Sequence, residues 1–303
     1  MELISKLVSH QIATEVNNPE EPILLMPVGD IQWAGVENQV AMRMLRDHIQ
    51  WGVDHNAYFL GMGDYIDYMS PSGREAYKGA KKYDSTLSVN DRAALMLVDE
   101  LYDRALAPSK GRWLGLLEGH HFHETTDGLT TDMYLADKLG AEFLGSSAYV
   151  RLRFSYVRGK GESPHVKYGD VLIWCHHGVG TGQTSAAVLN KLLKMSTGFD
   201  ADIYLMAHLH RKVAEPIDYT FPVYFADGET RLAHRTRIMA CTGSFLKGYV
   251  EGNVIGRIKR GTYVEQKMLT PVALGGVVVT IKPRWKRVGD SGEIWLPDLG
   301  VSQ

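Results

Sequence analysis

Short hydrophobic runs alternate along this chain with longer stretches in which apolar residues recur every three or four positions. The short runs are typical of buried β-strands, and the periodic stretches are typical of amphipathic helices. Their alternation predicts an α/β protein in which helices cover the faces of a β-sheet. The predicted strands span residues 23–28, 57–62, 113–117, 148–157, 171–174, 203–206, 238–241 and 277–281.

Four periodic stretches predict helices, over residues 36–51, 93–106, 129–139 and 185–195. Residues 88–91 (Ser-Val-Asn-Asp) form a good start for the second of these helices. Gly140 is the expected C-terminal cap of the third helix. Thr184 or Ser185 is the expected N-terminal cap of the fourth, because a side-chain oxygen there can accept from a free backbone N–H group.

The chain has no internal repeat, no low-complexity segment and no linker rich in Pro and Ser. A single domain over residues 1–303 is therefore the simplest interpretation, with a C-terminal part that is rich in β-strands. Residues 68–90 carry a Pro-Ser-Gly sequence followed by several Lys and Arg residues. We expect this segment to form a mobile surface insertion.

The composition is that of an ordinary soluble globular protein, with 45% hydrophobic and 22% charged residues and a net charge of −2. Cys175 and Cys241 both lie in apolar, strand-like runs, which predicts buried thiols in a reducing compartment and not a disulfide. The N-terminus does not resemble a signal peptide, and no stretch approaches the roughly 20 apolar residues that span a membrane. We therefore expect a soluble, cytoplasmic protein without a membrane partner.

Potential metal ligands collect where the predicted strands end. Five clusters are found, in the segments Gly29-Asp30-Ile31-Gln32, Gly63-Asp64-Tyr65-Ile66-Asp67, Gly119-His120-His121, His176-His177-Gly178 and Ala207-His208-Leu209-His210. Each cluster alone is weak evidence, because Gly-Asp at a strand end is more often a turn. Together, carboxylates with several imidazoles suit Mn, Fe, Zn or Ni better than Mg or Ca. The ligands suffice for two ions that share a carboxylate, an arrangement that enzymes use for displacement at phosphorus.

The order of the five clusters resembles the calcineurin-like metallophosphoesterase superfamily, and the resemblance spans about residues 29–210. It implies a four-layer αββα sandwich, in which two packed mixed β-sheets are flanked by helices. It also implies a cofactor of two divalent transition metal ions, with Mn as the first expectation and Fe, Zn or Ni as alternatives. The activity that it implies is hydrolysis of a phosphoester by a hydroxide bound between the two ions.

Carried over residue by residue, the resemblance implies roles for most of the clustered side chains. Asp30 and His210 would bind the first metal, with Gln32 at a further ligand position, and Asp64 would bridge both metals. The second metal would be bound by His120, His177 and His208. His121 would be the catalytic histidine, which can give a proton to the leaving oxygen. Asp67 would support His121, because a carboxylate on the second ring nitrogen fixes the tautomer and the ring direction.

Three residues depart from the family pattern. Gln32 stands where the family usually has His, and an amide oxygen is a weaker ligand than imidazole. His120 replaces Asn, which exchanges an oxygen ligand for nitrogen and favours softer metal ions. Ala207 replaces Gly, a small change. The first two departures leave the metal identity and the occupancy of both sites open.

Two residues near the clusters are further candidates. His123 can reach the substrate or support a ligand, or it can lie in an ordinary polar turn. Ser244 follows a late predicted strand, in a Thr-Gly-Ser turn of the kind that the superfamily often has near its site. The glycine-rich residues 178–185 lack the Lys of a P-loop, so nucleoside triphosphate binding of that type is rejected.

The type of ester is less well determined. Tyr68 stands where protein phosphatases of this superfamily carry Arg, which disfavours that activity. The segments at 126–129, 139–140, 144–145 and 242–246 resemble members encoded by phages and prophages. Basic segments with aromatic residues, at 151–167, 257–260 and 282–287, favour a phosphodiesterase, either a nuclease or a nucleotide-processing enzyme. A phosphomonoesterase for small substrates and a non-catalytic binding or structural protein are the alternatives. The oligomeric state and any partner protein stay open.

Overall fold

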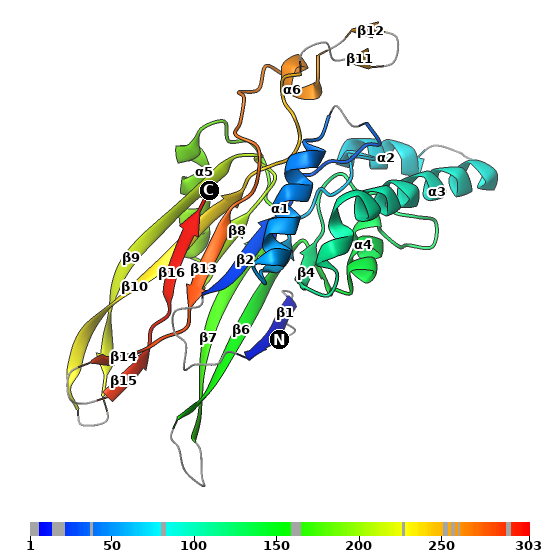
Figure 1. Ribbon diagram of the computed structural model, residues 1–303. Coiled ribbons are helices and arrows are strands. Elements are labelled where there is room, and N and C mark those ends of the chain that lie inside the picture. Colours follow the sequence, from blue (N-terminus) through cyan, green and yellow to red (C-terminus); the bar gives the residue numbers. More distant parts are fainter. Residues whose placement is uncertain are drawn as a thin grey trace.

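The structure is a computed structural model of the chain. It describes residues 6–13, 22–36, 39–79, 83–158, 165–225, 228–250, 254–255, 258–259, 261–288 and 292–303. Two six-stranded sheets form the centre of the fold (Figure 1). Within the described ranges, no helix combines the length and the apolar character needed to cross a membrane.

The first sheet has the strand order β16-β13-β2-β3-β4-β5. Its strands β2 to β5 run parallel to one another, and β13 and β16 extend the sheet in antiparallel fashion. The bounds of the strands are β2 Ile23–Val28, β3 Tyr58–Gly61, β4 Trp113–Leu117, β5 Phe143–Gly145, β13 Val278–Lys282 and β16 Asp298–Ser302.

The second sheet has the strand order β1-β6-β7-β8-β10-β9 and mixes parallel with antiparallel pairs. Its strands are β1 Lys6–Ala13, β6 Ser147–Arg158, β7 His165–His176, β8 Ile203–Met206, β9 Lys212–Tyr224 and β10 Thr230–Thr242. Two hairpins form small sheets of their own, and they consist of β11 Val254–Ile255 with β12 Ile258–Lys259 and β14 Trp285–Val288 with β15 Gly292–Trp295.

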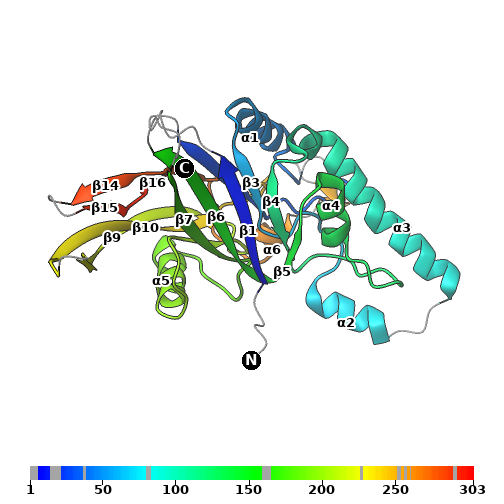
Figure 2. The ribbon, with the colours of Figure 1, turned by 90° about the horizontal axis from the view of Figure 1, so that it is seen from below.

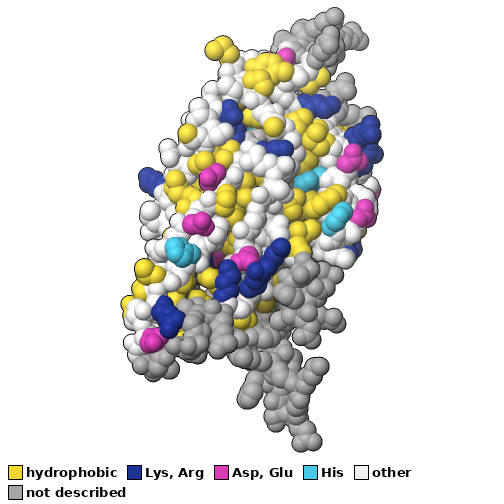
Figure 3. All heavy atoms as spheres, turned by 60° about the vertical axis from the view of Figure 1, so that its left-hand side comes forward, with side chains coloured by type: hydrophobic (Ala, Val, Ile, Leu, Met, Phe, Trp, Pro, Cys, Tyr) yellow, Lys and Arg dark blue, Asp and Glu magenta, His cyan; other side chains and the backbone are white. Residues whose placement is uncertain are grey.

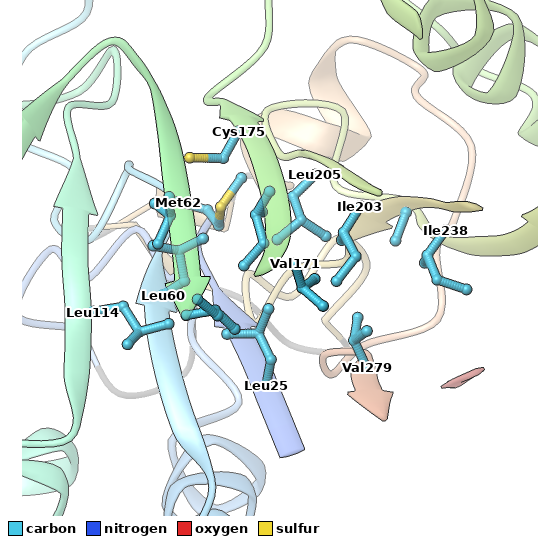
Figure 4. Close-up of a cluster of buried hydrophobic side chains, with 14 of the residues drawn as sticks. Leu25, Leu60, Met62, Leu114, Val171, Cys175, Ile203, Leu205, Ile238 and Val279 are labelled. Carbon is cyan, nitrogen blue, oxygen red and sulfur yellow. The ribbon is translucent and has the colours of Figure 1, made fainter. Parts of the chain in front are cut away.

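The two sheets pack face to face, and helices cover their outer faces. The layer between the sheets is a core of aliphatic side chains from both, including Leu25, Leu60, Ile203 and Leu205 (Figure 4). A second core joins the first sheet to α1 Met42–Asp54, α3 Asp84–Leu101 and α4 Thr131–Leu139. A third core joins the second sheet to α5 Ser185–Ser196. Figure 2 shows α5 and the helices of the first sheet on opposite sides of the two sheets. The expected four-layer αββα sandwich is confirmed.

Local caps agree well with the sequence, but helix starts agree less well. Gly140 caps α4 in the left-handed conformation, and the Thr184 side chain accepts from the Ala187 N–H group at the start of α5, as expected. The first predicted helix begins six residues later than expected, at Met42 instead of residue 36. The presumed helix start at residues 88–91 lies inside α3, which begins at Asp84 and continues into a π-helical turn, η1 Tyr102–Leu106, and a 3-10 turn, η2 Ala107–Ser109.

Residues 68–90 are mostly helical in the parts that the structure describes. They contain α2 Pro71–Gly79 and the first part of α3, and the Tyr68 hydroxyl donates to the carbonyl oxygen of Asn90 at 3.1 Å. That the segment is mobile, and that the chain is a single domain, stay predictions. The strand-rich C-terminal part contains β8 to β16 and one short helix, α6 Tyr263–Gln266.

Replacement of Gly140 by Ala tests the cap of α4. The φ angle of Gly140 is 68°, and a Cβ atom there would contact nothing within 4 Å, so the cost is conformational and not steric. We expect Gly140→Ala to lower the free energy of unfolding by about 1 kcal/mol in denaturant titration. Gly79→Ala is the matched control, because Gly79 has equally open surroundings without a left-handed φ. Equal losses in the two variants would contradict this explanation.

Candidate metal centre

The predicted ligands lie together at one edge of the two sheets, because each follows the carboxyl end of a strand. Asp30 follows β2, Asp64 follows β3, and His120 follows β4 in the first sheet. His177 follows β7, and His208 with His210 follows β8 in the second sheet. Backbone hydrogen bonds tie the first two segments side by side, from Asp30 N to Gly63 O at 3.0 Å and from Gln32 N to Asp64 O at 2.9 Å.

The backbone of this region is strained at several of the predicted ligand residues. Seven non-glycine residues in the described chain have positive φ angles, and five of them are predicted ligands: Asp30, Gln32, Asp64, His208 and His210. A non-glycine residue in the left-handed region costs about 1–2 kcal/mol. Such strain persists only where the surrounding structure imposes it, and it collects at functional sites.

Two glycines allow the backbone segments to approach closely. A Cβ atom on Gly119 would collide with the backbone nitrogen and the carboxylate of Asp64. A Cβ atom on Gly63 would lie 2.6 Å from His177 Nδ1 and 2.7 Å from the Gly119 Cα. Only glycine fits at either position, so both residues are needed to bring the ends of β3, β4 and β7 together.

The Asp64 carboxylate joins these segments. Its Oδ1 accepts from the backbone N–H groups of His120 and His121, the latter at 3.0 Å, and its Oδ2 lies 3.3 Å from His177 Nε2. Burial alone would raise the pKa of Asp64, but the hydrogen bond and charge of His177, the charge of His121 and the N–H of His120 hold the pKa well below its usual range. Asp64 is therefore an anion in the interior of the protein.

Asp30 is a buried carboxylate without a hydrogen-bond donor. It is 0% exposed, and neither of its oxygen atoms accepts a hydrogen bond from the described residues. Its nearest basic neighbour is His210, whose Nε2 lies 3.6 Å from Oδ1. Burial raises the pKa of Asp30 to about 8, against the lowering effect of the His177 charge. A buried carboxylate that accepts no hydrogen bond is an arrangement that a bound cation relieves.

Three imidazoles converge on the other side of Asp64. The ligand nitrogens of His120, His177 and His208 lie within 4.8 Å of one another, and His120 Nδ1 is 3.2 Å from His208 Nδ1. His177 Nδ1 lies 2.7 Å from Met62 O, and His208 Nε2 lies 3.0 Å from Gly180 O. A carbonyl oxygen only accepts, so these two nitrogens carry hydrogens, and the opposite ring nitrogens face the common centre.

The charges of these imidazoles differ. Burial, with the nearby His177, lowers the pKa of His120 to about 4. Burial also lowers the pKa of His177, but contact with Asp64 and the charge of Asp30 raise it overall to about 9. His120 is therefore neutral at neutral pH, whereas His177 would have to lose a proton before Nε2 could bind a metal.

Gln32 and His210 lie beside the two carboxylates. Gln32 Nε2 is 3.4 Å from Asp64 Oδ2 and 3.4 Å from His210 Nε2. An amide nitrogen carries two hydrogens and cannot bind a metal, so Gln32 acts here as a donor to Asp64. Ligation by Gln32 requires rotation of the amide, which would bring Oε1 to the same position.

His121 and Asp67 form a pair at the exposed side of the centre. His121 Nδ1 lies 2.8 Å from Asp67 Oδ1, and His121 Nε2 lies 4.0 Å from Asp64 Oδ2. Burial lowers the pKa of His121, but the hydrogen bond to Asp67 and the charge of Asp64 raise it overall. Asp67 keeps 44% of its side chain exposed. The His121 ring therefore lies between the Asp67 carboxylate and the centre, which is the expected order.

The two further candidates differ in their positions. The Ser244 hydroxyl donates to the carbonyl oxygen of Asp30 at 2.8 Å, so it supports a ligand segment from behind. His123 is buried, and its Nε2 lies 2.7 Å from Asp91 Oδ1, with the Tyr68 ring against its own. His123 belongs to neither group of residues that could hold a metal. The structure therefore places Ser244, but not His123, at the centre.

Sequence reasoning missed Asp132 and Arg74. Asp132 Oδ2 accepts from Gly119 N at 2.8 Å, and burial raises the pKa of this carboxyl to about 7. Arg74 donates to the carbonyl oxygen of His120 at 2.6 Å. In the sequence, Asp132 is an ordinary acidic residue in the first turn of a helix. Arg74 is one of several basic residues in a segment expected to be exposed, so no sequence signal marks either.

These side chains fit divalent transition metals. Asp30, Asp64 and His177 place ligand atoms within 4.8 Å of one another, as do the three converging imidazoles, and His177 belongs to both groups. Mixed carboxylate and imidazole ligands suit such ions. The ordering of His177 and His208 by backbone carbonyls is the kind of outer-shell support that metal-binding histidines have.

Comparison with known proteins gives little information about this chain. No model of a protein family matches the chain, and no curated protein matches it in sequence. Among solved structures, Vps29 of Chaetomium thermophilum is similar with a TM-score of 0.31 and 9% identity, over 93% of this chain and 97% of that chain. The same Vps29 complexed with the RaPID-derived cyclic peptide RT-D3 gives a TM-score of 0.23 and 10% identity, over 92% and 96%. Similarity at this level supports no statement about function.

Metal binding is expected to release protons, because two groups at the centre hold a proton at pH 7 in the metal-free protein. The pKa values of Asp30 and His177 are raised to about 8 and about 9. Both protons must leave when a metal binds, so the apparent affinity should rise between pH 6 and pH 9. Calorimetric titration with Mn²⁺ at pH 7, in two buffers of different ionisation enthalpy, measures the release. A binding enthalpy that is the same in both buffers would contradict it.

Proposed function

We propose that this chain is a metal-dependent phosphoester hydrolase of the calcineurin-like type, which acts on phosphodiesters. One observation carries the proposal. Two buried carboxylates and three converging imidazoles lie at the ends of five strands, and a histidine–carboxylate pair lies beside them. The arrangement combines a centre for cations with a separate acid group, and hydrolysis of a phosphoester needs both.

The ligands divide between two ions. Asp30 and His210 would hold the first ion, and His120, His177 and His208 would hold the second, with Asp64 between them. Bound ions of this kind lower the pKa of water and neutralise phosphate oxygens. Mn²⁺ is our first choice of ion, with Fe, Zn and Ni as alternatives. Cys175 and Cys241 are buried free thiols, which supports the cytoplasm as the place of action.

His121 is the residue that we assign to the leaving group. Its Nδ1 is engaged with Asp67, so Nε2 is the nitrogen that faces the centre, 4.0 Å from Asp64 Oδ2. The raised pKa of His121 keeps the ring protonated to higher pH than an isolated imidazole. His121 can therefore give its Nε2 proton to the departing oxygen, and Asp67 stabilises the cation before that transfer.

The basic segments support a small diester more than a long nucleic acid. Arg151 pairs with Asp170 at 2.5 Å, and Arg284 and Lys286 both pair with Asp298. On β7, Asp170 precedes His176 by six residues, which is about 20 Å of strand at about 3.3 Å per residue. Figure 3 shows Lys and Arg side chains beside Asp and Glu on the described part of one face, without a continuous basic stripe. In the basic segment 257–260, residues 257 and 260 lie outside the described residues.

Hydrolysis of bis-p-nitrophenyl phosphate by the Mn-loaded protein tests the proposal. We expect turnover of this diester, and a loss of about 10²–10⁴-fold in kcat in His121→Ala with metal retained, because proton transfer contributes on that scale. Asp67→Asn should lower kcat less, since it removes only the support of His121. The matched control is His55→Asn, which removes an exposed imidazole at the end of α1.

The alternatives give different results in the same assay. A phosphomonoesterase would hydrolyse p-nitrophenyl phosphate and leave the bis-ester intact. A non-catalytic protein would carry no transition metal after purification and would show no activity with any added divalent ion. Unchanged turnover in His121→Ala would remove His121 from the mechanism.

The choice of ion depends on His120, which supplies a third imidazole nitrogen to the second site. Zn²⁺ accepts nitrogen ligands more readily than Mn²⁺ does, so His120→Asn should lower the affinity for Zn²⁺ by about tenfold or more and change that for Mn²⁺ less. Competition with a chromophoric chelator measures both affinities, and His55→Asn again serves as the control. Equal losses for the two ions would show that His120 does not set the preference.

A further inference from the structure

The turn that carries His120 and His121 lies outside helices and strands, so its position depends on its contacts. β4 ends at Leu117 and α4 begins at Thr131, and the residues between them form a loop. On the inner side, the N–H groups of His120 and His121 donate to Asp64 Oδ1. The outer side of the turn faces α2.

Arg74 of α2 contacts the carbonyl side of the same turn. Its Nη1 donates to His120 O at 2.6 Å and to Phe122 O at 3.1 Å, and its guanidinium lies 3.8 Å from the centre of the Phe122 ring. A third contact, to Met69 O at 2.8 Å, ties the same group to the segment before α2. Hydrogen bonds from a charged donor are stronger than those between neutral groups.

One peptide group lies directly between Arg74 and Asp64. The carbonyl oxygen of His120 and the N–H of His121 belong to the same peptide unit. The oxygen accepts from the Arg74 cation, and the N–H donates to the Asp64 anion at 3.0 Å. The peptide dipole is therefore aligned between a positive and a negative charge, which favours one orientation of this unit.

The remaining contacts of α2 and α3 support the same loop. Asp91 on α3 holds His123 at 2.7 Å and accepts from the Thr126 N–H at 3.0 Å. Lys78 on α2 pairs with Glu124 at 2.7 Å, but both side chains are exposed, and an exposed pair contributes little. Arg74 is thus the contact of α2 that reaches the site residues themselves.

We propose that Arg74 is a positioning residue, which holds the imidazoles of His120 and His121 in place through the peptide group between them. The proposal rests on the proposed function, because that function gives the two imidazoles their roles in metal binding and catalysis. It assigns residues 68–90 a role at the centre, because α2 is the part of the segment that carries Arg74. Docking of α2 then influences both metal affinity and turnover.

Arg74→Ala tests the proposal, with Lys78→Ala as the matched control from the next turn of the same helix. We expect Arg74→Ala to lower the affinity for Zn²⁺ by about ten- to hundredfold, the range typical of residues that orient metal ligands. In the diester assay kcat should fall more than KM changes, because the acid group is displaced while the substrate site remains. Lys78→Ala should match the native protein in all respects.

Imidazole NMR provides a measurement that does not depend on activity. The side-chain ¹⁵N signals of His120 and His121 should shift in Arg74→Ala, with and without Zn²⁺, while those of His55 stay unchanged. Ethylguanidinium added to Arg74→Ala should restore part of the Zn²⁺ affinity. If Arg74→Ala does not fold, Arg74→Lys is measured instead, with the same shifts expected, because an ammonium cannot stack on the Phe122 ring as the planar guanidinium does.

The outcomes separate this inference from the proposed function. Shifted signals and weaker Zn²⁺ binding in a protein that hydrolyses no ester would support the role of Arg74 and overturn the hydrolase. An active native protein, with an Arg74→Ala variant that matches it in Zn²⁺ affinity, kcat and imidazole signals, would overturn the role of Arg74 alone.

Discussion

The Asp64 carboxylate is the group on which the rest of the centre depends. It lies in the interior after β3, accepts two N–H groups from the turn after β4, and faces His177 after β7. A buried anion requires compensation of this kind, because an ionised carboxylate without partners is too costly to bury. The missing side chain of Gly119 leaves the space for that contact. One carboxylate therefore joins the ends of strands from both sheets, and the other ligands are placed relative to it.

Energetically unfavourable features of the fold are also concentrated at the centre. Five left-handed residues lie at strand ends that meet at the centre, and one of them is Asp30, whose carboxylate accepts no hydrogen bond from the described residues. At about 1–2 kcal/mol for each left-handed residue, the strain is comparable to the net stability of a whole domain, about 5–15 kcal/mol. The burial of apolar side chains in the three hydrophobic cores acts against this strain. A bound cation would act in the same direction, because it would compensate the buried carboxylate of Asp30, which accepts no hydrogen bond from the described residues.

The sequence predicts the central strands and the ligand clusters, because both are local features. β4 and β8 are buried at every position and β2 at its last four, and all three strands are short apolar runs in the sequence. β9 lacked such a signal, since only one of its thirteen residues is fully buried and its sequence contains Pro216 and Pro222, residues that are rare in strands. The predicted start of α1 was wrong, because apolar residues before Met42 extend the helical pattern in the sequence although they lie outside the helix. Asp132 and Arg74 could not be found, because they act on backbone N–H and C=O groups, which every residue has.

The charges around the centre bear on the size of the substrate. If two divalent ions are bound, the carboxylates of Asp30 and Asp64 leave a net charge of about +2 where phosphate would lie. That field is screened within about 8 Å at physiological ionic strength, so it acts on the scale of one phosphodiester group. Arg151 and Arg153 on β6 both pair with Asp170 on β7. Asp170 is separated from the centre by about 20 Å of strand. Charged residues more than two screening lengths from the centre contribute nothing to the binding of a nucleotide-sized diester. They would matter only for a polymer that reaches them, and the pairing with Asp170 has already offset part of their charge.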